Sequence, residues 1–331
     1  MHVTVIQPGS RTTIQDLGRY GYEGSGIPVS GILDTSAMMR ANILVGNSPG
    51  HPAIECIGIG PVLSFSCDIV FAVCGGLFSV TLNGEPVRTE KAYAAHKGDE
   101  LRVTYSRTHR SCCIALSGDF DLIPSLGSYS TDIKSSLGGF SGTSLKKGDT
   151  IGLKNVRASV PRLNERELPE PPAKENITSL RVIEGPNEDR FTEDGKSTFY
   201  SGEYTVSLQS DRMGFRLEGP GIETVSGNDA VSFGIVKGAI QVTPSQPILM
   251  MSDHATTGGY TVIAAVISAD LPKASQLIPG DKIRFIRTTA DEAADAALLQ
   301  KKKTEDLDKA LNGTFFQRLS AKISGRKQQC I

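Results

Sequence analysis

A proline-rich, polar segment divides the chain of 331 residues near its middle. Residues 158–178 carry four prolines among Glu, Lys, Arg and Asn side chains. This composition is typical of a semi-rigid linker, because it offers too few apolar side chains for a core. Each flanking stretch is long enough for a domain of ordinary size. We therefore predict an N-terminal domain over 1–157, a C-terminal domain over 179–288 and a helical, basic tail over 289–331.

Both flanking stretches have the composition of β-strands. Runs such as 69–73, 101–105 and 204–208 are rich in strand-forming residues and are bounded by Gly, Asn and Asp. Asn83-Gly84 lies between two short apolar runs and predicts a hairpin, since the favoured tight turn needs positive φ at both positions. The 35 glycines and 17 prolines suit many turns. We predict a mainly β protein with few short helices.

Two helices are expected. The first covers residues 35–45, with Asp34 as its N-cap. The second covers residues 291–311 and begins with acidic residues, which favour the N-terminal end of a helix. Beyond it, residues 315–323 carry an apolar side chain at every fourth position. This short stripe is interpreted either as a frayed tail or as a segment that docks on a partner or on a membrane surface.

Charge and composition exclude several classes of protein. Lys and Arg total 35 against 36 Asp and Glu, a net charge of −1, so the chain is no general nucleic-acid binder. No apolar run approaches the length of a transmembrane helix, and the N-terminus lacks the pattern of a signal peptide. The six cysteines form no CxxC pair. We expect a cytoplasmic protein with reduced cysteines.

Familiar enzyme motifs are incomplete. Asp194-Gly195-Lys196-Ser197 resembles the end of a phosphate-binding loop, but Arg190 stands where the first glycine of that loop is needed. The five histidines lack metal-ligand spacing, so no metal site is predicted. The chain also lacks the Ala-Met-Lys-Met motif, so it carries no biotin attachment lysine of its own.

Three glycine-rich polar clusters, at residues 8–19, 210–217 and 253–260, are the candidate ligand-binding segments. Asp211 and Arg212 offer a proton acceptor beside a guanidinium fork that holds anions, or they simply fix a turn. His254 is either a proton carrier at neutral pH or a structural residue. The segment 256–259, Thr-Thr-Gly-Gly, predicts either an oxyanion-type pocket or a bulged turn.

These clusters, with other motifs, resemble one family, the C component of 5-oxoprolinase, also called the KipA or biotin-dependent carboxyltransferase (allophanate hydrolase subunit 2) family. The resemblance covers about residues 1–290. Its motifs are Pro-Gly-x-x-Thr-Thr-Ile-Gln-Asp-Leu-Gly-Arg at 8–19, Ala-Asn-x-Leu-Val-Gly-Asn at 41–47, Glu55 with Gly60-Pro61, Ser-Asp-Arg-Met-Gly at 210–214, Gly-Ala-Ile-Gln-Val at 238–242, Thr-Thr-Gly-Gly-Tyr at 256–260 and Gln-Leu-x-Pro-Gly-Asp at 276–281.

The resemblance implies two tandem cyclophilin-like β-barrels, and it implies the A component and the KipI-like B component of 5-oxoprolinase as partners. In such a complex, ATP with Mg²⁺ drives the opening of 5-oxoproline to glutamate. The family also implies two alternatives: a biotin-dependent carboxyltransferase acting on urea or a related amide, and a non-catalytic regulator that binds a KipI-like partner. The resemblance does not choose among these three, and no local motif locates ATP.

The candidate site follows from the clusters and the resemblance together. Both chemistries stabilise an oxyanion and move protons near an amide-like group. The predicted catalytic residues are Asp211, Arg212 and His254, and the predicted substrate-binding residues are Asn42, Glu55, Gln241, Thr256, Thr257, Gly258 and Gly259.

Two positions depart from the family pattern. Tyr129 stands where the family has the arginine of Gly-Ser-Arg-Ser-Thr, and Asp119 follows Gly118 where a second glycine is usual. If that arginine binds an anion in the family, this chain has lost one positive charge there.

Overall fold

The computed structural model of the chain describes residues 1–313, and the predicted apolar stripe at 315–323 lies outside this range. Strands supply most of the regular structure, which confirms the predicted mainly β class. Strands up to Lys154 pair within two sheets, and strands from Ile177 onward pair within a third. The exact domain boundaries stay predictions.

The N-terminal half consists of two antiparallel sheets with a shared core. Apolar side chains from both sheets, such as Val3, Leu63, Phe71 and Ile114, form one buried cluster. The first sheet has the order β11-β12-β1-β4-β9-β6-β7 and the second has the order β2-β3-β10-β5-β8. The strands are β1 (His2–Gln7), β2 (Arg11–Gln15), β3 (Ala53–Ile57), β4 (Val62–Phe65), β5 (Ile69–Gly75), β6 (Val80–Leu82), β7 (Glu85–Val87), β8 (Ala92–Ala95), β9 (Glu100–Val103), β10 (Ser111–Leu116), β11 (Asp119–Phe120) and β12 (Thr150–Lys154).

The local signals of this half are confirmed. Helix α1 (Thr35–Leu44) covers one face of the second sheet, and the Asp34 side chain accepts a hydrogen bond from the Ala37 amide at 2.8 Å. Asn83 and Gly84 join β6 to β7 with φ of 53° and 86°. These positive values are the ones that the tight hairpin requires.

The C-terminal half is built around one curled sheet with the order β13-β20-β14-β15-β18-β17-β19-β16, in which β13 also pairs with β19. Its core holds stacked aromatic rings, including Phe199 and Phe285 with centroids 4.7 Å apart. The predicted pair of cyclophilin-like barrels stays a prediction, because the pairings of the N-terminal half form two separate sheets. The strands are β13 (Ile177–Glu184), β14 (Tyr204–Val206), β15 (Gly214–Glu218), β16 (Asp229–Gly234), β17 (Ala239–Val242), β18 (Pro247–Met250), β19 (Thr257–Val266) and β20 (Lys282–Arg287).

Two further helices were not expected from the sequence. Helix α2 (Glu193–Ser201) contains the segment that resembles a phosphate loop, and α3 (Leu271–Ser275) follows β19. The expected second helix is confirmed as α4 (Ala290–Asn312), which begins with a capping box between Thr289 and Glu292. Single 3₁₀ turns complete the described chain at η1 (Glu23–Ser25), η2 (Leu163–Glu165), η3 (Glu188–Arg190) and η4 (Ser268–Asp270).

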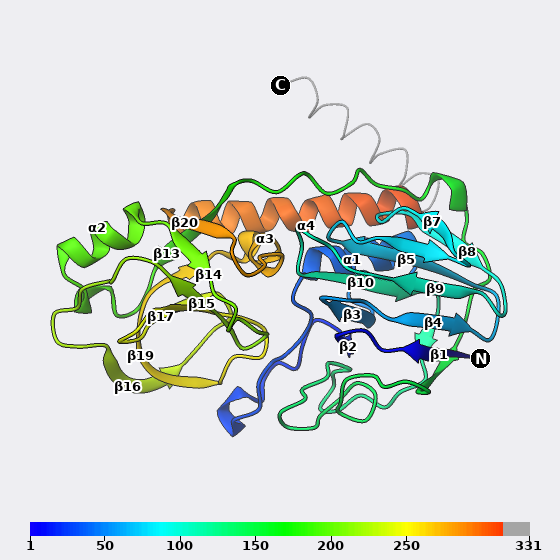
Figure 1. Cartoon of the computed structure of the whole chain (residues 1–331), viewed down its shortest axis with the longest axis horizontal. Coiled ribbons are helices and arrows are strands. Elements are labelled where there is room, and N and C mark those ends of the chain that lie inside the picture. Colours follow the sequence, from blue (N-terminus) through cyan, green and yellow to red (C-terminus); the bar gives the residue numbers. More distant parts are fainter. Residues whose placement is uncertain (314–331) are drawn as a thin grey trace, which may run out of the picture.

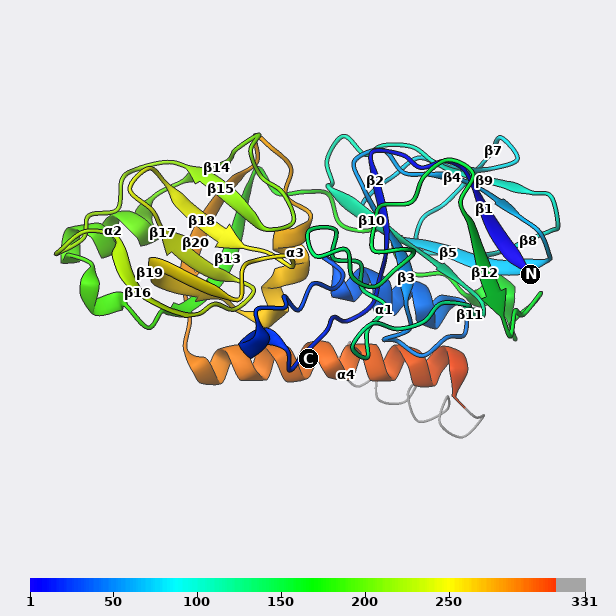
Figure 2. The same ribbon diagram turned by 90° about the horizontal axis from the view of Figure 1, so that it is seen from below.

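Helix α4 runs alongside both halves of the molecule (Figures 1 and 2). Its last turn packs on α1, where Leu311 contacts the apolar cluster beneath that helix. Arg166 of the linker is buried there and donates to the carbonyls of Ile43, Leu44 and Leu311 at 2.9 to 3.0 Å. One arginine therefore satisfies the open carboxyl ends of two helices. None of the helices within residues 1–313 has the length and hydropathy needed to cross a membrane.

Candidate functional site

Two adjoining cavities contain predicted site residues; the first lies within the C-terminal half, and the second lies where the two halves meet. The first, called the strand cavity, has a volume of about 220 Å³ and opens over β15, β17, β18 and β19. The second, the junction cavity, has a volume of about 410 Å³. Its walls are Arg11, Gly26, Pro28 and 132–135 from the N-terminal half, and 211–213 and 253–256 from the C-terminal half. Asp211, Met213, His254 and Ala255 line both cavities.

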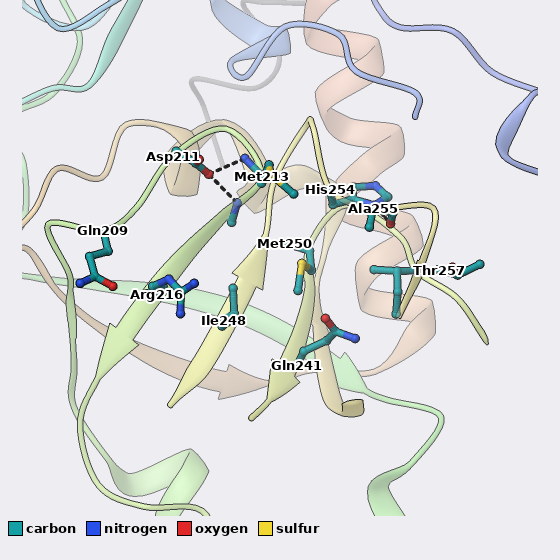
Figure 3. A pocket seen from close by; sticks show the side chains of 12 residues that line it. Gln209, Asp211, Met213, Arg216, Gln241, Ile248, Met250, His254, Ala255 and Thr257 are labelled. Carbon is teal, nitrogen blue, oxygen red and sulfur yellow. Dashed lines mark hydrogen bonds between the residues drawn. The ribbon is translucent and has the colours of Figure 1, made fainter. Parts of the chain in front are cut away.

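Asp211 stabilises the turn that leads into β15. Its Oδ1 accepts hydrogen bonds from the amides of Met213 at 2.8 Å and Gly214 at 3.3 Å (Figure 3). The residue is exposed and borders both cavities. Within the described residues, its second carboxylate oxygen has no hydrogen bond and stays available to a ligand. One oxygen of Asp211 thus fixes the turn, as one of the two predicted possibilities has it, and the role of Asp211 as a proton acceptor stays a prediction.

Arg212 lies at the centre of a buried ion network that joins the two halves. Its Nε and Nη2 each donate to Asp253 at 2.8 Å, and its Nη1 pairs with Glu55. Nη2 also donates to the carbonyl of Gly31 at 2.6 Å. Burial alone lowers the pKa of Arg212, but Glu55 and Asp253 outweigh it and raise that pKa above the ordinary value. The guanidinium fork predicted to hold an anionic ligand is therefore engaged by protein carboxylates, and Arg212 positions Asp253.

Glu55 and Asn42 do not reach either cavity. Glu55 is 1% exposed and also accepts a hydrogen bond from the Leu33 amide at 2.6 Å. Asn42 lies inside α1 and donates to the carbonyl of His51 at 2.6 Å, which fixes the loop after the helix. The two residues were predicted to complete the cleft. In the structure both side chains are buried and hold neighbouring segments together, Glu55 through Leu33 and Arg212 and Asn42 through the loop after α1.

His254 is a titratable side chain that lines both cavities, and its hydrogen bond fixes which ring nitrogen carries the proton. It is 5% exposed, and its Nδ1 lies 2.8 Å from the carbonyl oxygen of Ala255. A carbonyl only accepts, so Nδ1 carries the proton and the neutral ring keeps a free lone pair on Nε2. Burial lowers the pKa of His254 below the ordinary value. The side chain is therefore a neutral proton acceptor at physiological pH.

The predicted threonines and Gln241 also lie at the cavities. Thr256 borders the junction cavity, while Thr257 and Gln241 border the strand cavity (Figure 3). Gln241 donates from Nε2 to the carbonyl of Tyr260 at 3.4 Å. A Cβ atom at Gly258 would lie 2.4 Å from that Nε2, so the glycine makes room for the amide.

Gly258 and Gly259 are placed differently from the prediction. Both lie in β19, where Gly258 pairs with Phe233 of β16, and neither lines the strand cavity or the junction cavity. Their backbone continues a sheet rather than forming a separate oxyanion pocket.

Sequence reasoning did not select four residues that the structure places in the cavity walls. Asp253 and Arg11 were inside the quoted clusters but lacked a distinguishing signal, and they pair at 3.2 Å. Arg216 borders the strand cavity from β15. Asp132 borders the junction cavity from the loop that follows the Gly-Ser-Tyr-Ser-Thr segment at 127–131. Only the folded chain brings these side chains together.

A lysine lies close to this network. Lys237 donates from Nζ to the carbonyls of Ile32 at 3.2 Å and Leu33 at 3.1 Å. Burial, together with the positive charge of Arg212, lowers the pKa of Lys237 to about 8. The amino group therefore loses its charge more readily than a surface lysine.

The two departures from the family pattern lie outside both cavities. The backbone amide of Tyr129 donates a hydrogen bond to the Asp16 carboxylate at 2.7 Å, and its ring packs on the N-terminal core. Asp119 lies 3.4 Å from His51 and accepts from Asn155 at 2.6 Å. Their side chains are engaged in local structure. Among residues 1–313, no group of three or more His, Cys, Asp or Glu side chains is arranged to hold a metal ion.

Comparison with known proteins defines the class to which this fold and site belong. The chain matches the family described as carboxyltransferase domain, subdomain A and B, over residues 25–287, and it belongs to that family. It is 33% identical over 306 residues to the C component of 5-oxoprolinase from Escherichia coli strain K12, covering 92% of this chain and 96% of the relative. The corresponding protein of Haemophilus influenzae is 33% identical over 293 residues, covering 88% of this chain and 93% of the relative. The predicted family is thus confirmed.

A larger enzyme contains a similar region. The urea amidolyase of Saccharomyces cerevisiae is 30% identical over 338 residues, covering 96% of this chain but 18% of that protein. The crystal structure of the Kluyveromyces lactis urea amidolyase superposes with a TM-score of 0.86 at 30% identity, covering 92% of this chain and 20% of that chain. The relatives are therefore enzymes, or components of enzymes, named for reactions of amide compounds.

Proposed function

We propose that the chain is the C component of an ATP-dependent 5-oxoprolinase complex, which converts 5-oxoproline to glutamate together with the A component and the KipI-like B component. The similarity to two proteins of that name extends over more than nine-tenths of each relative. Nearly every segment of those proteins thus has a counterpart in this chain. A cytoplasmic location is part of the proposal and agrees with the free cysteines within residues 1–313.

The observation that carries the proposal is His254 at the boundary of two cavities, with a free Nε2 and a lowered pKa. Opening the lactam breaks its C–N bond, adds the hydroxyl of water to the carbonyl carbon and returns a proton to the nitrogen. A neutral imidazole is suited to take the proton from that water. The second carboxylate oxygen of Asp211 belongs to the same rim and is suited to accept a hydrogen bond from the leaving nitrogen.

The strand cavity supplies polar groups of the other kind. Gln241 and Arg216 border it and carry hydrogen-bond donors. Donors of this type stabilise the negative charge that develops on a carbonyl oxygen. In the proposed reaction they face the activated carbonyl, while His254 faces the water. Arg212 acts only indirectly, by holding Asp253 against the cavity wall.

ATP with Mg²⁺ enters the proposal as a co-substrate of the complex. The segment 194–197 lies in helix α2, so it does not form a phosphate-binding loop in this chain. The proposal assigns no residue of this chain to ATP. The chemistry ATP would supply is phosphorylation of the lactam oxygen with release of ADP, which turns a poor electrophile into a good one. Once water has added and the C–N bond has broken, a second water releases the phosphoryl group from the new carboxyl as inorganic phosphate.

The test is ATP- and 5-oxoproline-dependent glutamate formation by the chain mixed with its A and B partners. We expect glutamate only when the chain is present. We expect His254→Gln and Asp211→Asn to lower the rate without dissociating the complex. Asp121→Asn is the control, because Asp121 pairs with Lys154 on the surface of the N-terminal half. Full glutamate formation by His254→Gln would contradict the assigned role.

A second candidate function is biotin-dependent carboxyl transfer to urea or a related amide. It is favoured by the TM-score of 0.86 and 30% identity to the Kluyveromyces lactis urea carboxylase structure. Without an Ala-Met-Lys-Met motif in this chain, the carboxybiotin would be supplied by another protein. Urea-dependent loss of carboxyl from carboxybiotin, with no glutamate from 5-oxoproline, would favour this candidate. A stable complex that performs neither reaction would favour a regulatory role.

A further inference from the structure

Three neighbouring strands set a row of side chains across the floor of the strand cavity. Arg216 of β15 pairs with Ile248 of β18, and Ile248 pairs in turn with Gln241 of β17. Directly opposed residues of antiparallel strands point to the same face of a sheet. Figure 3 shows the three side chains in this order at the cavity. A charged donor and an amide donor therefore lie on either side of an apolar centre.

The core on the other face of the sheet fixes the direction of this row. The alternate residues Phe215 and Leu249 are fully buried in the C-terminal core. Strand side chains alternate between two faces, so Arg216 and Ile248 face the cavity. Neighbouring strands are about 4.8 Å apart, so the backbones of Arg216 and Gln241 are roughly 10 Å apart. Their side chains are long enough to meet the two ends of one small ligand.

The guanidinium of Arg216 has no partner in the described part of the chain. The backbone of the residue is held, because its amide donates to Ser210 Oγ at 3.0 Å and its carbonyl accepts from the Ser207 amide at 2.8 Å. Within residues 1–313, however, the guanidinium forms no hydrogen bond and no ion pair. None of its nitrogens is among the buried unpaired atoms of this range, so they are accessible to solvent and to a ligand in the cavity.

The other arginines beside the two cavities are engaged. Arg212 and Arg11 both pair with Asp253. Asp211 borders the same cavity as Arg216, but its carboxylate is bonded to backbone amides and forms no ion pair with Arg216. Among the cavity arginines of residues 1–313, Arg216 is thus the one whose charge is free for a ligand. A carboxylate or a phosphoryl group is the partner that a free guanidinium fork favours.

We propose that Arg216 selects an anionic substrate: its guanidinium donates two parallel hydrogen bonds to the free carboxylate of the lactam, while Gln241 donates to the lactam carbonyl. The inference rests on the proposed function, since it names the group of 5-oxoproline that urea lacks. A guanidinium has five N–H groups, so a carboxylate on two of them leaves others for the carbonyl oxygen. Arg212 serves two acceptors in this way, with Nε and Nη2 on Asp253 and Nη1 on Glu55.

The rest of the strand cavity suits the body of such a ligand. Its volume of about 220 Å³ is below that of pockets for drug-sized molecules, so it fits a substrate with one small ring. Ile248 and Met250 supply an apolar floor on which the ring methylenes can pack. Urea has neither a charge for Arg216 nor an apolar part for this floor.

The test compares two probes that differ in charge: 5-oxoproline, whose carboxylate is ionised at neutral pH, and its uncharged carboxamide. Binding is measured by calorimetry at neutral pH on the full chain, both alone and in complex with its A and B partners. We expect the wild-type protein to prefer the acid by about ten- to a hundredfold, the size expected for hydrogen bonds to a charged group. We expect Arg216→Gln to lose this preference while its affinity for the carboxamide stays close to the wild-type value.

Three controls keep the result interpretable. Retained carboxamide binding shows that Arg216→Gln is folded. Arg216→Lys keeps the charge but not the planar fork, so it should retain only part of the preference, and it decides the question if Arg216→Gln does not fold. Arg284→Gln removes an exposed arginine of the same half, which pairs with Glu203, and should leave the preference at the wild-type value.

The outcomes separate this inference from the proposed function. Equal affinities for the two probes in the wild-type protein, an undiminished preference in Arg216→Gln or Arg216→Lys, or no binding of either probe in either setting would overturn the subsite. Equal affinities together with binding of inorganic phosphate that depends on Arg216 would assign the fork to a phosphoryl group instead. A preference that depends on Arg216 in a complex that forms no glutamate would support the subsite and refute the 5-oxoprolinase activity. Glutamate formation with an unchanged KM for 5-oxoproline in Arg216→Gln would refute the subsite alone.

Discussion

The replacement Arg212→Met tests how much the buried ion pairs at the junction contribute to the stability of the protein. Arg212 is 1% exposed, and its loss leaves Glu55, also 1% exposed, without a counter-charge. Breaking a buried pair by removing one partner costs about 3–5 kcal/mol. With about 2–4 °C per kcal/mol for larger domains, the midpoint of thermal unfolding should fall by about 10 °C. Differential scanning calorimetry at neutral pH measures this shift.

A matched control exists on the surface of the same half. Arg284 pairs with Glu203 at 3.3 Å, and the two side chains are 47% and 43% exposed. Arg284→Met should therefore cost about 1 kcal/mol or less, the usual value for an exposed pair. Adding Glu55→Leu to Arg212→Met should recover part of the loss, because it removes the orphaned charge. Equal losses for the two arginine variants, or strictly additive effects in the double variant, would refute this reasoning.

Three further perturbations have defined outcomes. His254→Gln should lower kcat/KM by about 10²–10⁴-fold, the usual range for a lost general base. The wild-type pH–rate profile should show an acidic limb below the ordinary histidine pKa, because the neutral ring is the active form and burial lowers the pKa of His254. The variant should lack this limb, and a limb that persists in it would belong to another group. Lys237 has a pKa of about 8 in the folded protein, whereas in the unfolded chain it keeps its proton up to about pH 10.4. The free energy of unfolding of the wild-type protein should therefore rise relative to that of Lys237→Met as the pH increases between these values. Urea unfolding at a series of pH values measures this difference. Arg166→Ala should destabilise the protein by about 3 kcal/mol, because it removes the hydrogen-bond donor of several buried carbonyls. It should also speed amide hydrogen exchange near residues 305–312. Unchanged exchange there would show that α4 does not depend on Arg166.

Features set by neighbouring residues were predictable from the sequence. Asp34 caps α1, and Asn83-Gly84 turns a hairpin, because each signal and its consequence lie within a few residues. Helix α2 was missed because Gly195 interrupts its helical propensity. The reason for that glycine is tertiary, since a Cβ there would lie 2.2 Å from the carbonyl oxygen of Glu223. Local propensity cannot show such a contact.

The candidate site was predictable only in part. The glycine-rich clusters contain Asp211, His254 and the adjacent threonines, all of which border a cavity, while their roles stay predictions. The partners of Arg212 were not predictable, because Glu55 is 157 residues away in the chain. Asp132 directly follows the segment at 127–131 that matches a family motif, but only the folded loop brings it to the wall of the junction cavity. Such contacts between distant segments are properties of the packed molecule rather than of any one segment.

The docking of α4 on α1 also has a consequence for synthesis on the ribosome. The two sheets of the N-terminal half can pack as soon as that half is synthesised. The carboxyl end of α1, in contrast, is covered only when Leu311 packs on it and Arg166 binds the carbonyls of both helices. Domains generally fold as they emerge, from the N-terminus onward. Here the first half to emerge is closed by a segment that is translated about 150 residues after its last strand, at Lys154. A nascent chain stalled before α4 should therefore expose an apolar surface on its oldest part, where a chaperone would bind.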